Sequence, residues 1–141
     1  MRQLLLAATA LAAAGCTQLP AKTRSWSEGV SYAPIGNATN MDAAFIMGAP
    51  NQSGLYTIRV HIKEGGLMPP HSHPDDRMIT VVSGTLHYGF GDKADPAATI
   101  AYPTGSYFLA KANEPHYAIG KDEAVYQEAG MAPTGTKWVA Q

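Results

Sequence analysis

The apolar residues of this chain fall into short runs between glycine, proline and polar turn residues, and this pattern restricts the fold more than any other feature. In the run 55–63, Ile58, Val60 and Ile62 alternate with polar residues, which is the period of a strand with one buried and one solvated face. No window beyond the first sixteen residues has the roughly 3.6-residue period of an amphipathic helix. The pattern predicts an all-β protein, either a sandwich or a jelly-roll barrel. The strand-like runs cover residues 43–47, 55–63, 77–82, 85–90, 99–101, 107–110, 116–119, 124–129 and 136–139.

Length and charge fit a single small domain. The 141 residues are enough for one domain with a modest core. The 14 glycines and 10 prolines stand mostly between the strand-like runs, and Ser83-Gly84 predicts a two-residue hairpin loop. The 10 Lys and Arg residues balance 11 Asp and Glu residues and form no basic cluster. Since phosphate binding needs clustered cations, we expect no nucleic-acid partner.

The first sixteen residues have a different character from the rest. Arg2 carries the only charge, and an apolar run over residues 4–14 is followed by Gly15-Cys16. The run is too short to span a bilayer but fits the apolar part of a signal peptide. Residues 13–16 resemble a bacterial lipobox, with Ala13 in the position that leucine usually takes. We therefore expect a lipoprotein-type signal over residues 1–15, a lipid anchor at Cys16 with a tether over 16–24, and a barrel domain over 25–141.

The alternative is an ordinary secretory signal that is cut after Ala14. Both interpretations predict an exported protein, either a periplasmic or outer-membrane-anchored lipoprotein or a soluble secreted or periplasmic one. In the first case the lipid is the only expected link to a membrane. Cys16 is the only cysteine, so the folded domain has no intrachain disulfide and no thiolate metal ligand.

Three histidines form a candidate metal site. His71 and His73 are one residue apart, and side chains at such positions of a strand share a face about 6.5 Å apart. A third histidine, His116, follows in a distant segment. Neutral imidazole suits Zn, Cu, Fe and Ni, and three protein ligands leave coordination positions open. His61 lies on the polar face of its run and is interpreted as an exposed strand residue, and His87 is a weaker candidate for the site.

The spacing of these residues resembles the two sequence motifs of the cupins. The first cupin motif joins a glycine, a His-x-His pair, a glutamate and a second glycine, and the matching residues are Gly65, His71, His73, Arg77 and Gly84. The second motif is matched by Gly105 and His116. The chain is also similar to a group of small exported bacterial cupins, with the marks His-Pro-Asp-Asp-Arg and Ala-Pro-Thr-Gly-Thr. This resemblance implies a single cupin domain, which is a double-stranded β-helix or jelly-roll barrel, with a divalent metal held by the three histidines.

Arg77 stands where the motif has glutamate, and three interpretations of it are open. A guanidinium is always protonated and cannot coordinate a metal. In the first interpretation three histidines hold the metal and Arg77 binds an anionic group of the substrate by a bidentate hydrogen bond. In the second, Arg77 forms a structural ion pair with Asp75, Asp76 or Glu128. In the third, Asp75 or Asp76 replaces the missing carboxylate ligand.

The resemblance does not decide between two classes of function. One is a metal-dependent enzyme, dioxygenase-like or isomerase-like, that acts on a small organic molecule. This molecule is anionic if Arg77 binds it. The other is a non-enzymatic cupin that binds or senses a metal or small ligand, with a metal-free form as a further alternative. Fe, Mn, Ni, Zn and Cu are not distinguished by the ligand set. Cupins often pair through their sheets, which implies a homodimer.

Overall fold

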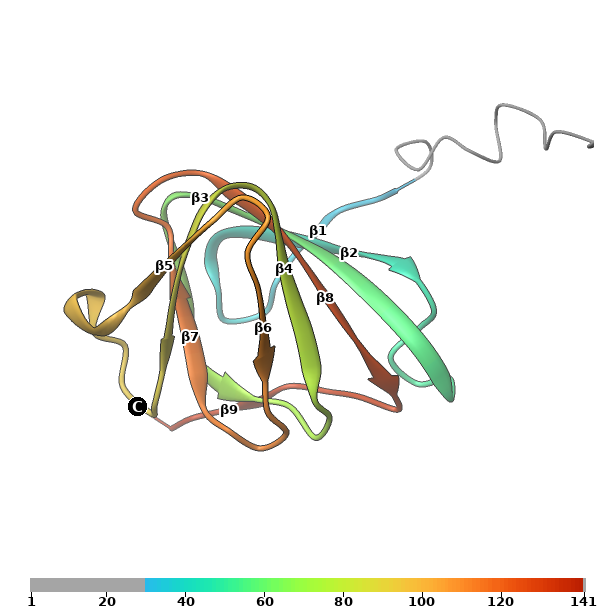
Figure 1. Cartoon of the computed structure of the whole chain (residues 1–141). Helices are drawn as coiled ribbons and strands as arrows, with labels where there is room; N and C mark the ends of the chain where they lie inside the picture. Colours follow the sequence, from blue (N-terminus) through green and yellow to red (C-terminus); the bar gives the residue numbers. More distant parts are fainter. Residues whose placement is uncertain (1–29, 141) are drawn as a thin grey trace, which may run out of the picture.

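The structure is a computed structural model and describes residues 30–140, which form strands that curve around one interior (Figure 1). The only helical element in this range is a 3-10 turn, η2 (Pro96–Ala98). Within the same range, no helix has the length and apolar character needed to cross a membrane. The predicted all-β jelly-roll barrel is thus confirmed. The strands are β1 (Ala33–Pro34), β2 (Thr39–Met47), β3 (Gly54–Ser72), β4 (Arg77–Phe90), β5 (Ile100–Pro103), β6 (Tyr107–Ala110), β7 (His116–Ile119), β8 (Ala124–Ala132) and β9 (Lys137–Trp138).

Two long strands, β3 and β4, close the barrel because each pairs with different strands along its two halves. The first half of β3 pairs with β8 over residues 54–62, and its second half pairs with β7 from Leu67 to His71. The first half of β4 pairs with β8 and β6, and its second half pairs with β7 and β5. In Figure 1 both strands arch from one side of the barrel to the other. All these pairings are antiparallel. Because β7 and β8 each pair with both long strands, each lies between β3 and β4.

The predicted hairpin at Ser83-Gly84 is wrong, since β4 runs through these residues without a break. The pairing of β4 with β8 is shifted between Val81 and Ser83, which marks a β-bulge. Gly84 has a φ of 73°, a left-handed conformation that bends the strand at the point where its partner changes from β8 to β7. Gly65 has the same φ and makes the corresponding bend in β3. A glycine with a turn-like neighbour can therefore mark a strand corner as well as a hairpin.

The alternation predicted for the run 55–63 is present in β3. Val60 and Ile62 are 2% and 1% exposed, while Lys63 on the opposite face is exposed. These two residues belong to the main apolar cluster, which also includes Ile79, Leu86 and Tyr126 from β4 and β8. The interior is thus filled by alternate residues of the long strands, and a cavity remains next to His71 and His73.

A substitution at Gly84 tests the strand corner. An alanine Cβ at this position would lie 2.1 Å from the carbonyl oxygen of Glu123, whereas Gly105 has a similar φ of +87° and no atom within 4 Å of such a Cβ. We expect Gly105→Ala to lower the free energy of unfolding by about 1–2 kcal/mol, the cost of the left-handed conformation alone. Gly84→Ala should lower it by roughly 2 kcal/mol more, because the backbone has to move. Urea denaturation of the two variants measures the difference, and equal effects would show that Gly84 is not at a crowded corner.

Candidate metal centre

The structure brings His71, His73 and His116 together inside the barrel. His71 lies near the end of β3, His73 follows that strand, and His116 begins β7, where it is the direct pairing partner of His71. One ligand nitrogen from each ring lies within 4.8 Å of those of the other two. All three side chains are buried, with exposed fractions of 4%, 4% and 2%. The predicted set of histidines is therefore a spatial cluster, built by the β3–β7 pairing.

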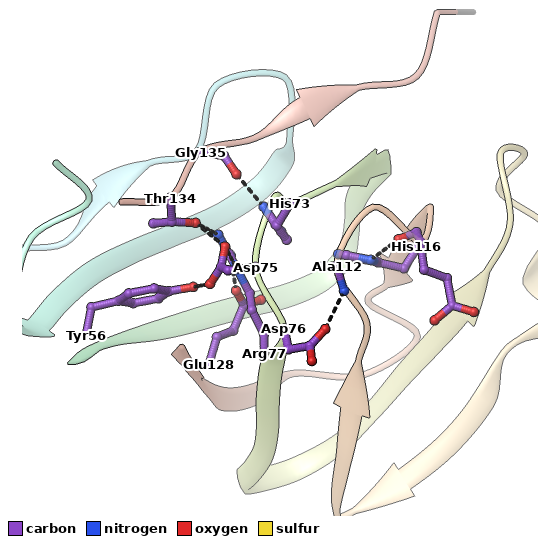
Figure 2. A network of polar contacts seen from close by, with 11 residues as sticks. Tyr56, His73, Asp75, Asp76, Arg77, Ala112, His116, Glu128, Thr134 and Gly135 are labelled. Atoms are coloured by element: carbon purple, nitrogen blue, oxygen red, sulfur yellow. Dashed lines mark hydrogen bonds and ion pairs between the residues drawn. The ribbon is translucent and has the colours of Figure 1, made fainter. Parts of the chain in front are cut away.

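Each of the three rings is fixed by a backbone carbonyl at its Nδ1 atom. The acceptors are the carbonyl oxygens of Pro69, Gly135 and Glu114, at 2.7, 2.7 and 2.9 Å from His71, His73 and His116 respectively. Figure 2 shows the bond of His73. A carbonyl can only accept, so each Nδ1 carries the proton and each neutral ring has its lone pair on Nε2.

The Nε2 atoms meet the requirements of a metal site. That of His73 is buried and has no hydrogen-bond partner among the described residues. Buried polar atoms without a partner are rare and call for an explanation. Three neutral imidazoles whose Nδ1–H groups are held by carbonyl oxygens form the usual inner and outer coordination spheres of a histidine-bound metal. The residues present thus fit a divalent transition metal.

Burial keeps the three rings neutral. It lowers the pKa of His71, His73 and His116 from 6.5 to about 4, and their mutual proximity adds to the effect. Desolvation disfavours the imidazolium form, and a second positive ring nearby disfavours it further. At neutral pH all three Nε2 lone pairs are therefore available to a cation.

These pKa values predict how the metal-free protein responds to acid. Between pH 6.5 and about 4 the unfolded chain binds protons at these histidines that the native state does not bind, so the free energy of unfolding falls as the pH is lowered through this range. Below the native pKa this contribution levels off. Urea denaturation in the presence of a chelator, at a series of pH values, measures the slope. Replacement of all three residues by glutamine should make the slope shallower, and an unchanged slope would contradict the assignment.

Arg77 belongs to a buried polar network next to His73 (Figure 2). Its Nη1 atom donates to Glu128 Oε2 at 2.5 Å, and its Nη2 atom donates to Thr134 Oγ1 at 2.8 Å. The Nε atom lies 3.8 Å from Asp75 Oδ1. Asp75 also accepts hydrogen bonds from the hydroxyls of Thr134 and Tyr56. The network joins β3, β4, β8 and the segment after β8.

Within this network Glu128 is a carboxylate held ionised. It is 5% exposed, and burial alone would raise its pKa, but Arg77 and the nearby His73 lower the pKa below the usual value. Glu128 pairs with Ile79 across the β4–β8 ladder, two residues beyond Arg77, and this register brings the two charges together.

The ion pair corresponds to one of the three sequence interpretations of Arg77, and Glu128 is the partner at hydrogen-bonding distance. Among the described residues the group of closely spaced ligand atoms contains histidines only, so the structure lends no support to the interpretation with a shifted ligand. Asp75 is engaged by Tyr56 and Thr134, and Asp76 accepts from the Ala112 N–H at 2.7 Å. An anion-binding role for Arg77 stays a prediction.

A cavity of about 360 Å³ adjoins the triad. His71, His73, Arg77 and Glu128 belong to its lining, together with apolar residues of β2 and β3. Trp138 of β9 also lines it, with its ring 5.3 Å from that of His71. Sequence reasoning assigned neither Trp138 nor Thr134 to the site. Thr134 lies in the Ala-Pro-Thr-Gly-Thr mark and Trp138 in no motif, and only the fold returns the C-terminal segment to the site.

The two other histidines and two tyrosines of the barrel lie at the edge of the site or outside it. Tyr88 is buried and stacks on His116 with ring centroids 5.4 Å apart, whereas Tyr107 is 74% exposed. His61 is half-buried on the outer face of β3, where its Nε2 lies 3.1 Å from Glu123. Neither His61 nor His87 joins the cluster. Cys16, with the predicted signal and tether, lies outside the described residues.

A jelly-roll barrel with two histidines from one strand end and a third from the neighbouring strand defines a class of protein, the cupins. In agreement with the site, the sequence model of the cupin domain family matches residues 58–126. The chain belongs to the cupin superfamily.

Known proteins similar to this chain include plant germin-like proteins and bacterial cupin structures. Germin-like protein 3-1 of Oryza sativa subsp. japonica is 32% identical over 89 residues, which are 62% of this chain and 40% of that protein. The chain spans less than half the length of the curated germin-like relatives it matches.

Among solved structures, the polyketide cyclase RemF from Streptomyces resistomycificus has a TM-score of 0.67 at 15% identity, over 80% of this chain and 82% of that one. An RmlC-like cupin from Shewanella frigidimarina has a TM-score of 0.60 at 16% identity, over 76% and 87% of the two chains. Such low identities show a shared fold and nothing about a shared reaction.

Proposed function

We propose that this protein binds one divalent transition metal through His71, His73 and His116 and binds a small organic molecule in the adjoining cavity. The observation that carries the proposal is the hydrogen bond that all three rings share, from Nδ1 to a backbone carbonyl. Three separate backbone carbonyls accept from three Nδ1–H groups, which leaves the lone pair of each ring on Nε2, and one ligand nitrogen of each ring lies within 4.8 Å of those of the other two. A packing role for these histidines would not require that all three have the same tautomer.

When bound, such a metal supplies a Lewis acid or a redox centre at the cavity wall. Burial of the three rings within the barrel keeps the ligand nitrogens neutral. Trp138 and Tyr88 pack against His71 and His116 and limit the movement of these rings. The network around Arg77 ties the segment after β3 to β8, and this holds His73 in position.

A second candidate function is binding or sensing without turnover. It is favoured by the arginine at the position where the cupin motif has a carboxylate ligand, since this arginine is neutralised by Glu128 within the protein. The two functions share the metal and the cavity and differ in whether the bound molecule is changed. A substrate screen with product analysis on the metal-loaded protein separates them.

Titration of the metal-free full chain with Co²⁺ tests the metal site. We expect saturation at one ion per chain and a visible absorption spectrum typical of nitrogen ligands, both lost in His73→Ala. His61→Ala is the matched control, because His61 lies outside the cluster on the outer face of β3. Failure to bind a metal, or equal binding by the two variants, would overturn the proposal.

The proposal includes export, with a lipid on Cys16, as an expectation from the sequence. Fractionation of cells that produce the full chain tests it: the wild type should be found with membranes, and Cys16→Ala should not. A homodimer formed through the outer faces of the sheets is also expected, and the molar mass in solution tests it.

A further inference from the structure

We infer that the cavity beside the triad selects molecules with an uncharged, largely apolar body, of which only one end reaches the metal centre. This inference rests on the proposed function and adds the chemical class of the ligand. It follows from the composition of the cavity wall and from the way in which the charged groups of the wall are already paired.

The wall is formed mainly by apolar side chains from four strands. The β2–β3 register places Ala43 opposite Val60 and Phe45 opposite Ile58, and all four residues line the cavity. Phe45 is 41% exposed, and Ile58 is only partly buried where it packs against the main apolar cluster. Side chains that face inward and remain accessible leave apolar surface for a ligand to cover.

The charged groups of the wall do not offer a free charge to a ligand. Arg77 and Glu128 are 4% and 5% exposed and bind each other at 2.5 Å, so their charges cancel. The second terminal nitrogen of Arg77 is held by Thr134 at 2.8 Å. An anionic ligand would have to break this pair or enter without a partner, and an unpaired charge in an apolar wall is strongly disfavoured.

Binding of three hydroxamates to the Co²⁺-loaded full chain tests the inference. Acetohydroxamate, benzohydroxamate and para-carboxybenzohydroxamate share one metal-binding head and differ in the body, which is small, apolar or anionic. We expect benzohydroxamate to bind about tenfold more tightly than either of the others, measured by calorimetry, because it buries a ring without a charge. Tightest binding of the carboxylated compound would overturn the inference and support anion binding by Arg77. Equal affinities of all three would also overturn it.

A cavity-filling variant ties this preference to the proposed wall. Ala43→Leu adds three carbon atoms opposite Val60 and should remove most of the advantage of benzohydroxamate over acetohydroxamate while metal binding persists. Ala101→Leu, on an exposed position of β5, is the matched control and should leave the advantage intact. The same advantage in both variants would show that the ring binds elsewhere.

Binding of a fluorescent probe to the metal-free protein tests the inference separately from the proposed function. The neutral fluorescent probe N-phenyl-1-naphthylamine should bind the metal-free wild type and Ala101→Leu, and bind Ala43→Leu at least several-fold more weakly. If no metal binds but the probe follows this pattern, the proposed metal function fails and the apolar cavity stands. If metal binds but the probe binds Ala43→Leu as tightly as the wild type, the inference about the ligand fails and the proposed metal function stands.

Discussion

Replacement of Arg77 by methionine is expected to lower the free energy of unfolding by about 3–5 kcal/mol, the usual effect of removing one partner of a buried ion pair. Glu128 would remain buried with no cation next to it, at 5% exposure. Thr134 and Asp75 would each lose a contact to the guanidinium as well. Denaturation by urea measures the change, and a loss of less than about 1 kcal/mol would show that the network adds little to stability.

The pH dependence and a double variant identify the cause of this loss. Without Arg77, burial raises the pKa of Glu128, so the native state of the variant takes up a proton more readily than the unfolded chain. The defect should therefore shrink as the pH falls and the carboxyl group becomes neutral. Arg77→Met combined with Glu128→Leu should recover most of the stability at neutral pH, because it leaves no buried charge. No recovery in the double variant would show that lost packing, and not the unpaired charge, causes the defect.

The local signals of this sequence were sufficient for the all-β class and for the His71–His73 pair. The alternation of Val60 and Ile62 with polar residues depends only on the period of a strand, and it is present in β3. The His71–His73 spacing likewise depends on local geometry. His116 could be added only through the resemblance to the cupin motifs, because the β3–β7 pairing that brings it to His71 is a long-range contact.

The properties that sequence reasoning could not predict depend on strand register and on the C-terminal segment, which comes back to the site. Asp75, Asp76 and Glu128 were equivalent partners for Arg77 until the β4–β8 register placed Glu128 beside it. At Ser83-Gly84 the sequence is compatible with a hairpin. The structure has a bend there instead, because β4 pairs with β8 before this point and with β7 after it. The cavity wall likewise requires Trp138, which reaches the site only because β9 pairs with the end of β3.

The second large effect expected is stabilisation by metal. A divalent metal at a thousandfold excess over its Kd should raise the free energy of unfolding of the full chain by about 4 kcal/mol, because the unfolded chain does not hold three imidazoles together. His116→Ala removes the ligand that comes from β7 and should lose most of this gain, whereas His61→Ala should keep it. Thermal unfolding with metal and with a chelator measures both. Equal gains in the two variants would place the metal outside the triad.

The response of this stabilisation to acid gives an independent check on the triad. Protons compete with the metal for Nε2, and the competition begins only near the native pKa. For histidines with an ordinary pKa of 6.5, the gain would already decline below neutral pH. Burial lowers the pKa of these three to about 4, so the gain should persist at about pH 5 and disappear as the pH falls through 4. A metal effect that declines between pH 7 and 6 would contradict binding by the three buried histidines.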